Sequence, residues 1–219
     1  ERLKNKMLDK VKRPIPTYSQ NITFMHRYQF NYMYFRYFMW NFAGRQNDIQ
    51  GMGDDVDGNW ISGIPFLDNA RLGDQPKDVA ALNNKGTNKY YMLPLLLGLI
   101  GLIFYSIRDL KNSFVVLMLF LMTGLAIAFY LNMYAYQPRE RDYAFAASFY
   151  AFCIWIGFGV YAIYSFFEKM KSKVVQIVAP SVTTLVCLLL VPGVLAKENW
   201  DDHDRSIRYT AWAAAKGYL

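Results

Sequence analysis

The hydrophobic and polar positions of this chain are separated on a long scale. Four stretches contain no charged residue and are mostly apolar, with lengths of 18, 27, 25 and 23 residues. Their charged boundaries are Lys89 and Arg108, Lys111 and Arg139, Asp142 and Glu168, and Lys173 and Lys197. About 18 apolar residues are enough to cross the roughly 30 Å hydrocarbon layer as a helix. The pattern therefore predicts an all-α membrane protein with about four transmembrane helices.

A fifth segment, residues 22–42, is rich in aromatic residues. Its apolar positions step by three or four, which predicts one helical face. That face consists of Phe24, Tyr28, Tyr32, Phe35, Met39 and Phe42. Because Tyr and Trp favour the headgroup level, we expect an interfacial helix that lies against the bundle. The alternative is a fifth spanning helix, since the segment is long enough and Arg27 and Arg36 could reach the interface along their apolar stems.

Residues 43–89 differ from the rest of the chain, because seven glycines occur there among many Asp and Asn residues. This composition is typical of a water-facing loop. A passive connector of such length is uncommon. The segment also contains several large apolar residues, which predict an ordered external loop that packs on another part of the molecule. They are Trp60, Ile61, Ile64, Phe66 and Leu67.

These segments divide the chain into four parts. They are a basic segment (1–21), the aromatic helix with the external loop (22–89), the membrane block (90–197) and the start of a further segment or domain (198–219). The chain begins with Glu1 instead of Met, and residues 206–219 read as a helix without a terminating signal. We therefore expect a longer parent protein.

The composition excludes a purely soluble globular protein. The chain is 54% hydrophobic and 19% charged, whereas soluble domains carry about 25% charged residues. The net charge of +7 does not indicate nucleic acid, because the basic residues are scattered; the lipid bilayer is the nearer source of phosphate for the basic residues 1–13. Cys153 and Cys187 both lie inside apolar stretches, where packing is a more ordinary role than a disulfide.

The short connections between the spans predict the orientation. Arg108 and Lys111 flank the first turn, and the third turn carries the lysines of residues 169–173. The positive-inside rule places both turns in the cytoplasm. The external loop, the second turn (137–143) and the C-terminal segment then share the opposite face. The basic residues 1–13 argue against this orientation.

The second turn contains four consecutive ionisable residues, which are costly at a bilayer boundary unless they pair or bind a ligand. The planar fork of an arginine fits phosphate oxygens two at a time. We therefore predict that the phosphate of a lipid carrier is held by Arg139, Arg141 and Arg45. Supporting or acceptor contacts are expected from Asp48, Glu140, Asp142 and Tyr143. The alternative is an internal ion-pair network of Arg139 and Arg141 with Glu140, Asp142 or Asp48.

A further polar cluster, residues 199–205, follows the last span and includes Asp201, Asp202, His203 and Asp204. These residue types suit a divalent metal, but adjacent residues rarely converge on one ion. Aspartates before a helix more commonly cap its free N–H groups, and this is the first expectation here. Contact with the substrate or acceptor is the second. No metal site and no cofactor are predicted, and the phosphate-loop, dinucleotide, zinc-protease and serine-hydrolase motifs do not occur.

Four segments resemble a known family. They are YFRYFMWNFAGRQND (34–48), NNKGTNKYYMLPLLLGLIGL (83–102), YQPRERDYAF with SFYAFCIWIGFGV (136–145 and 148–160), and NWDDHDRS (199–206). Together they resemble the DUF2723 membrane proteins of Bacteroidetes. That family is similar to GT-C-fold glycosyltransferases and to the protein O-mannosyltransferase class. The resemblance implies a polytopic inner-membrane enzyme that transfers a sugar from a polyprenyl-phosphate donor to protein acceptors on the periplasmic side.

The resemblance also implies that the chain is a central fragment. In the family, the acidic residue expected to act as catalytic base lies in a first external loop, which would precede Glu1, and a soluble periplasmic domain would follow. The catalytic base is therefore not assigned, and the fragment alone is expected to be inactive. From a different class, the alternative is a non-catalytic membrane scaffold or transporter subunit. The uncharged spans disfavour an ion or proton path through this block.

Overall fold

The computed structural model describes residues 15–51, 53–74, 84–135, 141–168, 172–203 and 209–217. Three helices are long and apolar enough to cross a membrane, and a fourth apolar helix is shorter. The three are Leu110–Leu131, Asp142–Glu168 and Lys173–Trp200, and the shorter one is α6 (Leu93–Arg108). The chain is an all-α membrane protein, as the sequence predicts.

Helix α6 is shorter than its charge-free stretch because the first residues of that stretch belong to the loop. The N–H of Tyr90 donates to the carbonyl of Ala43, which ties Tyr90 to the loop. Tyr91 and Met92 then adopt left-handed backbone angles, which an α-helix cannot continue through. The helix therefore begins at Leu93, and its 16 residues span about 24 Å at 1.5 Å per residue.

The other apolar stretches form helices with local breaks. The second comprises α7 (Leu110–Thr123) and α8 (Leu125–Leu131), which meet at Gly124. The third is a 3-10 turn, η2 (Asp142–Phe145), followed by α9 (Ala146–Glu168). The fourth is α10 (Lys173–Leu188), the π-helical η3 (Leu189–Gly193) and α11 (Val194–His203), and a separate helix, α12 (Thr210–Gly217), comes later. Cys153 in α9 and Cys187 in α10 are free thiols.

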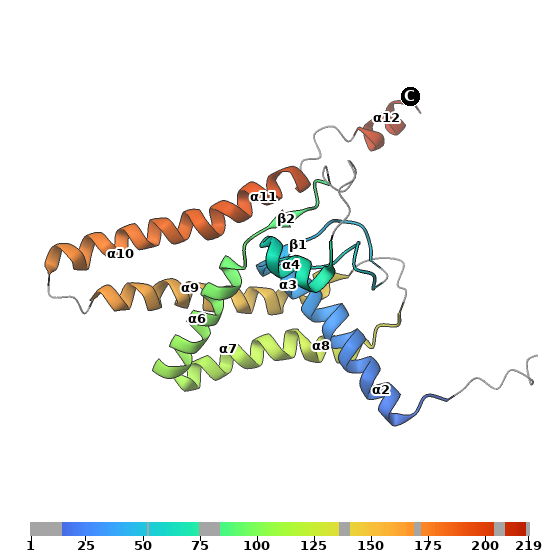
Figure 1. Cartoon of the computed structure of the whole chain (residues 1–219), viewed down its shortest axis with the longest axis horizontal. Helices are drawn as coiled ribbons and strands as arrows, with labels where there is room; N and C mark the ends of the chain where they lie inside the picture. Colours follow the sequence, from blue (N-terminus) through green and yellow to red (C-terminus); the bar gives the residue numbers. More distant parts are fainter. Residues whose placement is uncertain are drawn as a thin grey trace, which may run out of the picture.

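Helices α6 and α9 cross in close contact (Figure 1). Any Cβ atom at Gly101 would collide with the backbone carbonyl of Trp155, and one at Gly159 would collide with the carbonyl of Leu97. Small residues that let two backbones approach are typical of membrane helix pairs. Gly157 differs, because the space around its Cβ position is open.

The aromatic helix runs continuously through α2 (Tyr18–Phe24), η1 (Met25–Phe35) and α3 (Arg36–Phe42). It begins four residues before the predicted start, because Thr17 and Gln20 form a capping box. The middle segment is a π-helix, whose i→i+5 hydrogen bonds change the angular spacing of side chains.

Because of this changed spacing, the prediction that six residues share one inner face of the helix is wrong for Phe24 and Phe35. Phe24 and Phe35 are 38% and 42% exposed, although the regular helical period places them on the inner face. Among the residues that the structure describes, most of the buried ones lie between the predicted positions, and only Phe42 belongs to the predicted face. The buried residues are Gln29, Met33, Tyr34, Arg36, Tyr37, Phe38 and Phe42.

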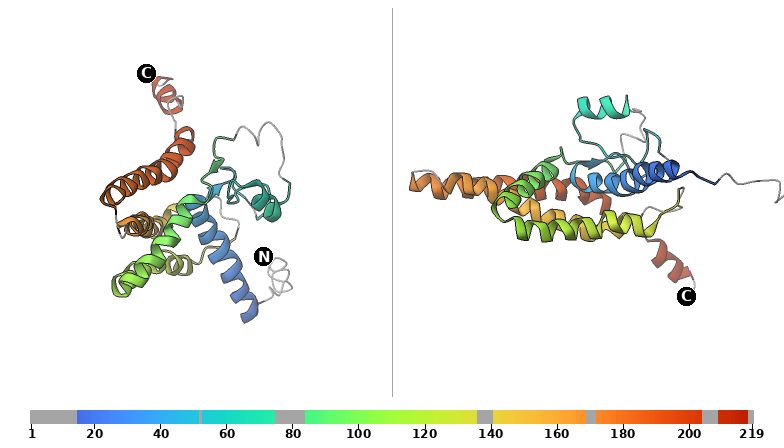
Figure 2. Two further views of the ribbon diagram at one scale, coloured as in Figure 1. Left: turned by 60° about the vertical axis from the view of Figure 1, so that its left-hand side comes forward. Right: turned by 90° about the horizontal axis from the view of Figure 1, so that it is seen from below.

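The external loop is closed at its base by two short strands. Strands β1 (Gly44–Arg45) and β2 (Asn88–Lys89) pair antiparallel, with Arg45 opposite Asn88. Within the loop, α4 (Pro65–Leu72) lies off the layer of long helices (Figure 2). The predicted packing of the loop is confirmed for Ile61, which is buried, but not for Phe66, which is 80% exposed. Ile64 and Leu67 are also exposed, so the apolar side of α4 remains uncovered within the described residues.

Different elements of the structure lie at the two ends of the helix bundle (Figure 1). The turn between α6 and α7, the end of α9 and the start of α10 lie at one end. The loop strands, the start of α9 and the end of α11 lie at the other, which we call the polar end. Since the helix Asp142–Glu168 has 27 residues, its two ends are about 40 Å apart.

Candidate functional site

The polar end contains a layer of aromatic rings around a buried arginine. We call Tyr32, Tyr37 and Trp40 the aromatic layer. The guanidinium carbon of Arg36 lies 4.0, 4.5 and 4.6 Å from the centres of these three rings, respectively. Such cation–π contacts are worth most when the cation is removed from water, and Arg36 is only 4% exposed.

Arg36 also connects the aromatic helix to the external loop. Its Nε donates to the carbonyl of Tyr32 at 3.0 Å, and its Nη1 donates to the carbonyl of Gly58 at 2.9 Å. Gly58 has a positive φ of 64°, and a Cβ there would lie 3.3 Å from Nη1. The loop therefore approaches the arginine at a position where glycine gives both the backbone angle and the space.

The first predicted phosphate ligand, Arg45, lies at the edge of this layer. Its guanidinium is 5.8 Å from the ring centre of Trp40, and its Nε donates to the carbonyl of Gly86 at 2.9 Å. The side chain is half-buried. Strand pairing opposite Asn88 holds its backbone at the base of the loop.

Arg141 reaches the same layer from the membrane block. Its backbone N–H donates to the hydroxyl of Tyr37 at 3.4 Å, and the ring of Tyr37 lies 5.2 Å from that of Trp40. The side chain of Arg141 is exposed. Arg45 and Arg141, which are 96 positions apart in the sequence, thus flank one pair of neighbouring rings.

The remaining residues of the second turn lie beside Arg141 or outside the described part of the chain. Asp142 accepts a hydrogen bond from the backbone N–H of Tyr143 at 2.9 Å, at the start of η2, and both side chains are exposed. Arg139 and Glu140 fall within residues 136–140, which the structure does not describe.

Asp48 lies next to the loop segment that Arg45 contacts. Its Oδ1 accepts a hydrogen bond from the side-chain amide of Asn84 at 3.1 Å, two residues before the carbonyl that accepts from Arg45. Arg45 and Asp48 therefore both bind the segment 84–86 by hydrogen bonds.

The C-terminal cluster meets the base of the loop through Asn199. Its Oδ1 accepts hydrogen bonds from the side-chain amide of Asn88 at 3.2 Å and from the hydroxyl of Tyr90 at 3.0 Å. The carboxylate of Glu198 accepts from the backbone N–H of Lys89 at 3.1 Å. These contacts join α11 to β2, the strand that pairs with Arg45.

The predicted capping role of the C-terminal aspartates is wrong for Asp201 and Asp202. Both residues, with His203, form the last turn of α11 instead of preceding a helix. The reason is that the helix does not stop where the apolar stretch ends but continues through the charged residues. Asp204 lies outside the described residues.

The aspartates of the external loop have structural partners. Asp54 accepts hydrogen bonds from the backbone N–H groups of Val56 and Asp57 at 3.0 and 2.7 Å. Asp57 accepts from the side-chain amide of Asn47 at 3.0 Å. Among the described residues, no group of three or more His, Cys, Asp or Glu side chains could hold a metal ion.

Sequence reasoning treats Arg36 as an interruption of an apolar pattern, whereas the structure makes it the centre of the aromatic layer. The signal was present in the sequence, because Tyr32 and Trp40 lie four residues before and after Arg36. Side chains four residues apart meet on a helix.

Comparisons with models of known protein families, with curated proteins and with solved structures find no match for this chain.

Proposed function

We propose that this chain is part of a polytopic inner-membrane glycosyltransferase that transfers a sugar from a polyprenyl-phosphate donor to protein acceptors. In this proposal the polar end faces the periplasm, and Arg45 and Arg141 hold the donor phosphate. Arg139 joins them as a third ligand. The resemblance of four segments to DUF2723 proteins supports the reaction class.

The observation that carries the proposal is that Arg45 and Arg141 lie beside neighbouring rings at the polar end. The guanidinium of Arg45 is 5.8 Å from the ring centre of Trp40, the backbone N–H of Arg141 donates to the hydroxyl of Tyr37, and these two rings are 5.2 Å apart. The exposed side chain of Arg141 precedes the spanning helix directly. A lipid phosphate lies at this depth while its tail stays among the hydrocarbon chains.

The chemistry needs positive charge at this point. The acceptor hydroxyl attacks the anomeric carbon of the sugar, a carboxylate base takes the hydroxyl proton, and the lipid phosphate leaves with the bonding electron pair. Arginine donors stabilise the charge that develops on the leaving phosphate. The carboxylate base is not assigned to a residue of this chain.

A lipid-binding experiment tests the phosphate site without knowledge of the sugar. The full-length protein is placed in nanodiscs with either polyprenyl monophosphate or uncharged polyprenol. Replacement of both Arg45 and Arg141 by Ala is expected to weaken binding of the phosphate lipid by about 100-fold, since two charge-assisted contacts are lost. Binding of polyprenol should not change.

The matched control is Arg108→Ala, because Arg108 lies at the opposite end of the bundle beside Phe104 and Tyr161. It should bind polyprenyl monophosphate like the wild type. In cells, the double variant should insert into the membrane normally yet fail to glycosylate protein. Unchanged binding and unchanged glycosylation in the double variant would reject the proposal and favour a non-catalytic membrane scaffold.

A further inference from the structure

Asn199, near the end of the last span, binds the segment at the base of the external loop that contains β2. Its amide oxygen accepts hydrogen bonds from the side-chain amide of Asn88 at 3.2 Å and from the hydroxyl of Tyr90 at 3.0 Å. Its amide nitrogen donates to the carbonyl of Leu195 at 2.7 Å, one turn earlier in α11. The side chain is therefore held by its own helix and presents one oxygen to two residues of the loop base.

The two donors that meet this oxygen are buried. Asn88 is 2% exposed and Tyr90 is 3% exposed. Side chains two positions apart in an extended segment lie on the same face, so both donors reach α11 from one face. A buried donor that loses its acceptor is not compensated by water. The oxygen of Asn199 therefore stabilises this segment in one position.

The backbone of the same segment is held from two sides. The N–H of Lys89 donates to the carboxylate of Glu198 at 3.1 Å, and the N–H of Tyr90 donates to the carbonyl of Ala43 at 3.1 Å. Neighbouring N–H groups of an extended segment point to opposite edges. The segment thus lies between α11 on one side and the chain around β1 on the other (Figure 1).

The strand pair at the loop base is too short to hold its position alone. Strands β1 and β2 have two residues each. Even a complete two-stranded hairpin is only marginally stable in water. The contacts from α11 therefore contribute to keeping the loop base in place.

Arg45 takes its position from this segment at two points. Its backbone pairs with Asn88, and its Nε donates to the carbonyl of Gly86 at 2.9 Å. A Cβ at Gly86 would lie 2.6 Å from the Cβ of Asp48, so the two sides of the loop base are in close contact there. An arginine side chain has many rotamers, and fixing one of them requires such contacts. A displacement of the segment would therefore displace the guanidinium from its place beside Trp40.

We infer that Asn199 is a positioning residue for Arg45. It keeps residues 86–90 in the place from which the carbonyl of Gly86 orients the guanidinium. The inference rests on the proposed function, in which Arg45 binds the donor phosphate. Asn199 acts through Arg45 and is not itself a phosphate ligand. A binding group on a loop depends on such support, because a small misplacement of a charged group weakens its contact with the ligand.

The first experiment measures binding of polyprenyl monophosphate and of uncharged polyprenol by the full-length protein in nanodiscs. Asn199→Leu keeps the approximate size of the side chain but removes the acceptor. It should weaken binding of the phosphate lipid by about tenfold and leave binding of polyprenol unchanged. The matched control Asn69→Leu makes the same replacement at an exposed position of α4 and should bind both lipids like the wild type.

A double-mutant cycle shows whether the effect passes through Arg45. In an Arg45→Ala protein, the addition of Asn199→Leu should not weaken binding of the phosphate lipid further. In an Arg141→Ala protein, the same addition should still weaken it by about tenfold. A general loss of structure would lower binding in both backgrounds, so equal effects in the two would overturn the inference.

Hydrogen exchange on the protein without polyprenyl lipid tests the contact itself. The N–H groups of Ile61 and Tyr90 donate across the loop base to the carbonyls of Gly44 and Ala43. Both should exchange about tenfold faster in Asn199→Leu, whereas the N–H groups of α9 should exchange as in the wild type. Unchanged exchange at the loop base would overturn the inference.

The inference and the proposed function fail in different ways. If Arg45→Ala binds polyprenyl monophosphate like the wild type, the proposed donor site is wrong and the positioning role falls with it. If Arg45→Ala weakens binding and Asn199→Leu does not, the donor site stands and only the role of Asn199 is rejected.

Discussion

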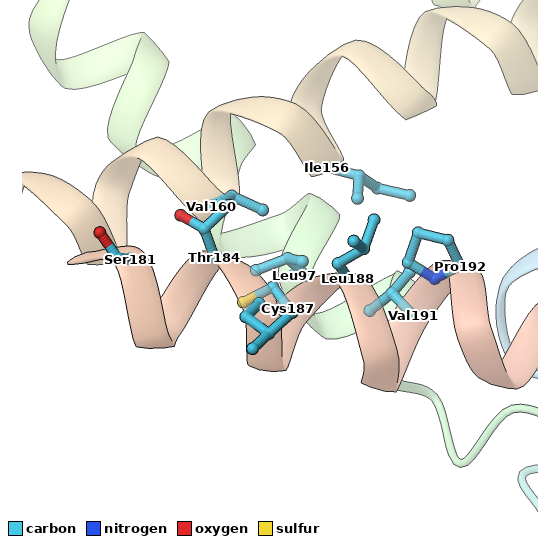
Figure 3. Close-up of a pocket in the computed structure, with 10 residues that line it drawn as sticks. Leu97, Ile156, Val160, Ser181, Thr184, Cys187, Leu188, Val191 and Pro192 are labelled. Carbon is cyan, nitrogen blue, oxygen red and sulfur yellow. The ribbon is translucent and has the colours of Figure 1, made fainter. Parts of the chain in front are cut away.

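Helix α9 contacts its neighbours in two opposite ways. On one side it meets α6 and the aromatic helix without a gap: Gly101 and Gly159 bring two backbones into contact, and Ser148 lies 2.6 Å from the hydroxyl of Tyr34. We call this the sealed side. On the other side a groove lies between α9 and α10 (Figure 3), and we call this the open side.

The difference shows what holds helices together in this protein. In a bilayer, lipid chains are as apolar as the side chains, so helices associate through close packing and hydrogen bonds. The sealed side has both. The open side has two prolines in the helix that faces α9, and a groove lined mainly by apolar side chains separates the two helices there.

The largest effect on stability is expected when one methyl group is added to the close contact between α6 and α9 on the sealed side. Gly101→Ala would place a Cβ against the backbone of Trp155, and the helices must separate. We expect a loss of about 3 kcal/mol in the free energy of unfolding, measured by unfolding in mixed micelles. The control is Gly157→Ala, whose added Cβ meets open space. Equal stability of the two variants would remove the distinction between the sides.

A smaller effect on stability is expected when the arginine at the centre of the aromatic layer is replaced. Arg36→Met retains the apolar stem but removes the hydrogen bond to Gly58 and the contacts with three rings. We expect a loss of about 2 kcal/mol and faster proteolysis of residues 53–59. Arg27→Met, at an exposed position of the same helix, should cleave at the wild-type rate. A stable, protease-resistant Arg36→Met protein would contradict this role.

Loss of the hydrogen bond between Tyr34 and Ser148 is expected to lower the free energy of unfolding by about 1 kcal/mol. The size of this effect should also depend on pH. Tyr34 lies in the aromatic helix, outside the three spans, and burial raises its pKa to about 12, against a smaller lowering by Ser148. The ordinary value is 10.0, so the phenol is neutral in both states below pH 10. Between pH 10 and 12 the unfolded chain ionises first, and the native state loses stability.

The Tyr34→Phe variant lacks the ionisable phenol hydroxyl. The stability difference between the wild type and Tyr34→Phe should therefore be constant up to about pH 9.5 and decrease toward pH 12. Unfolding free energies at several alkaline pH values measure it. A difference that stays constant up to pH 12 would mean that Tyr34 is not desolvated.

The smallest effect on stability is expected on the open side. Thr184→Phe adds a large ring at an exposed position that lines the groove between α10 and α9. We expect a change in the free energy of unfolding within about 1 kcal/mol, measured under the same conditions as the glycine variants. A loss as large as that of Gly101→Ala would show that the open side is as closely packed as the sealed side.

Much of the architecture follows directly from the order of residues. Charge-free stretches set the number and positions of the apolar helices, because the length of a span is fixed by the bilayer. The exception is the first stretch, where Tyr90 is held by Ala43 in the loop. Contacts between distant segments decided that boundary, and no local pattern contains them.

Arg45 and Arg141 could be named as candidates from residue type and position in the sequence. The ring that lies beside each of them, Trp40 for Arg45 and Tyr37 for Arg141, depends on the packing of the aromatic helix. The π-helical segment changed which residues face inward, and this made the predicted face wrong at Phe24 and Phe35. A hydrogen-bond shift of one residue leaves no trace in hydrophobicity alone.

The sequence alone determined that this is a helical membrane protein with a polar, glycine-rich loop between the aromatic helix and the first apolar helix, because apolar length and turn composition are local properties. Only the tertiary structure decided which side of α9 is sealed, where Arg36 lies and how the loop reaches the start of the membrane helices. The physical reason is that close packing depends on the distance between two backbones. That distance is set jointly by glycines, prolines and helix type on segments far apart in the chain.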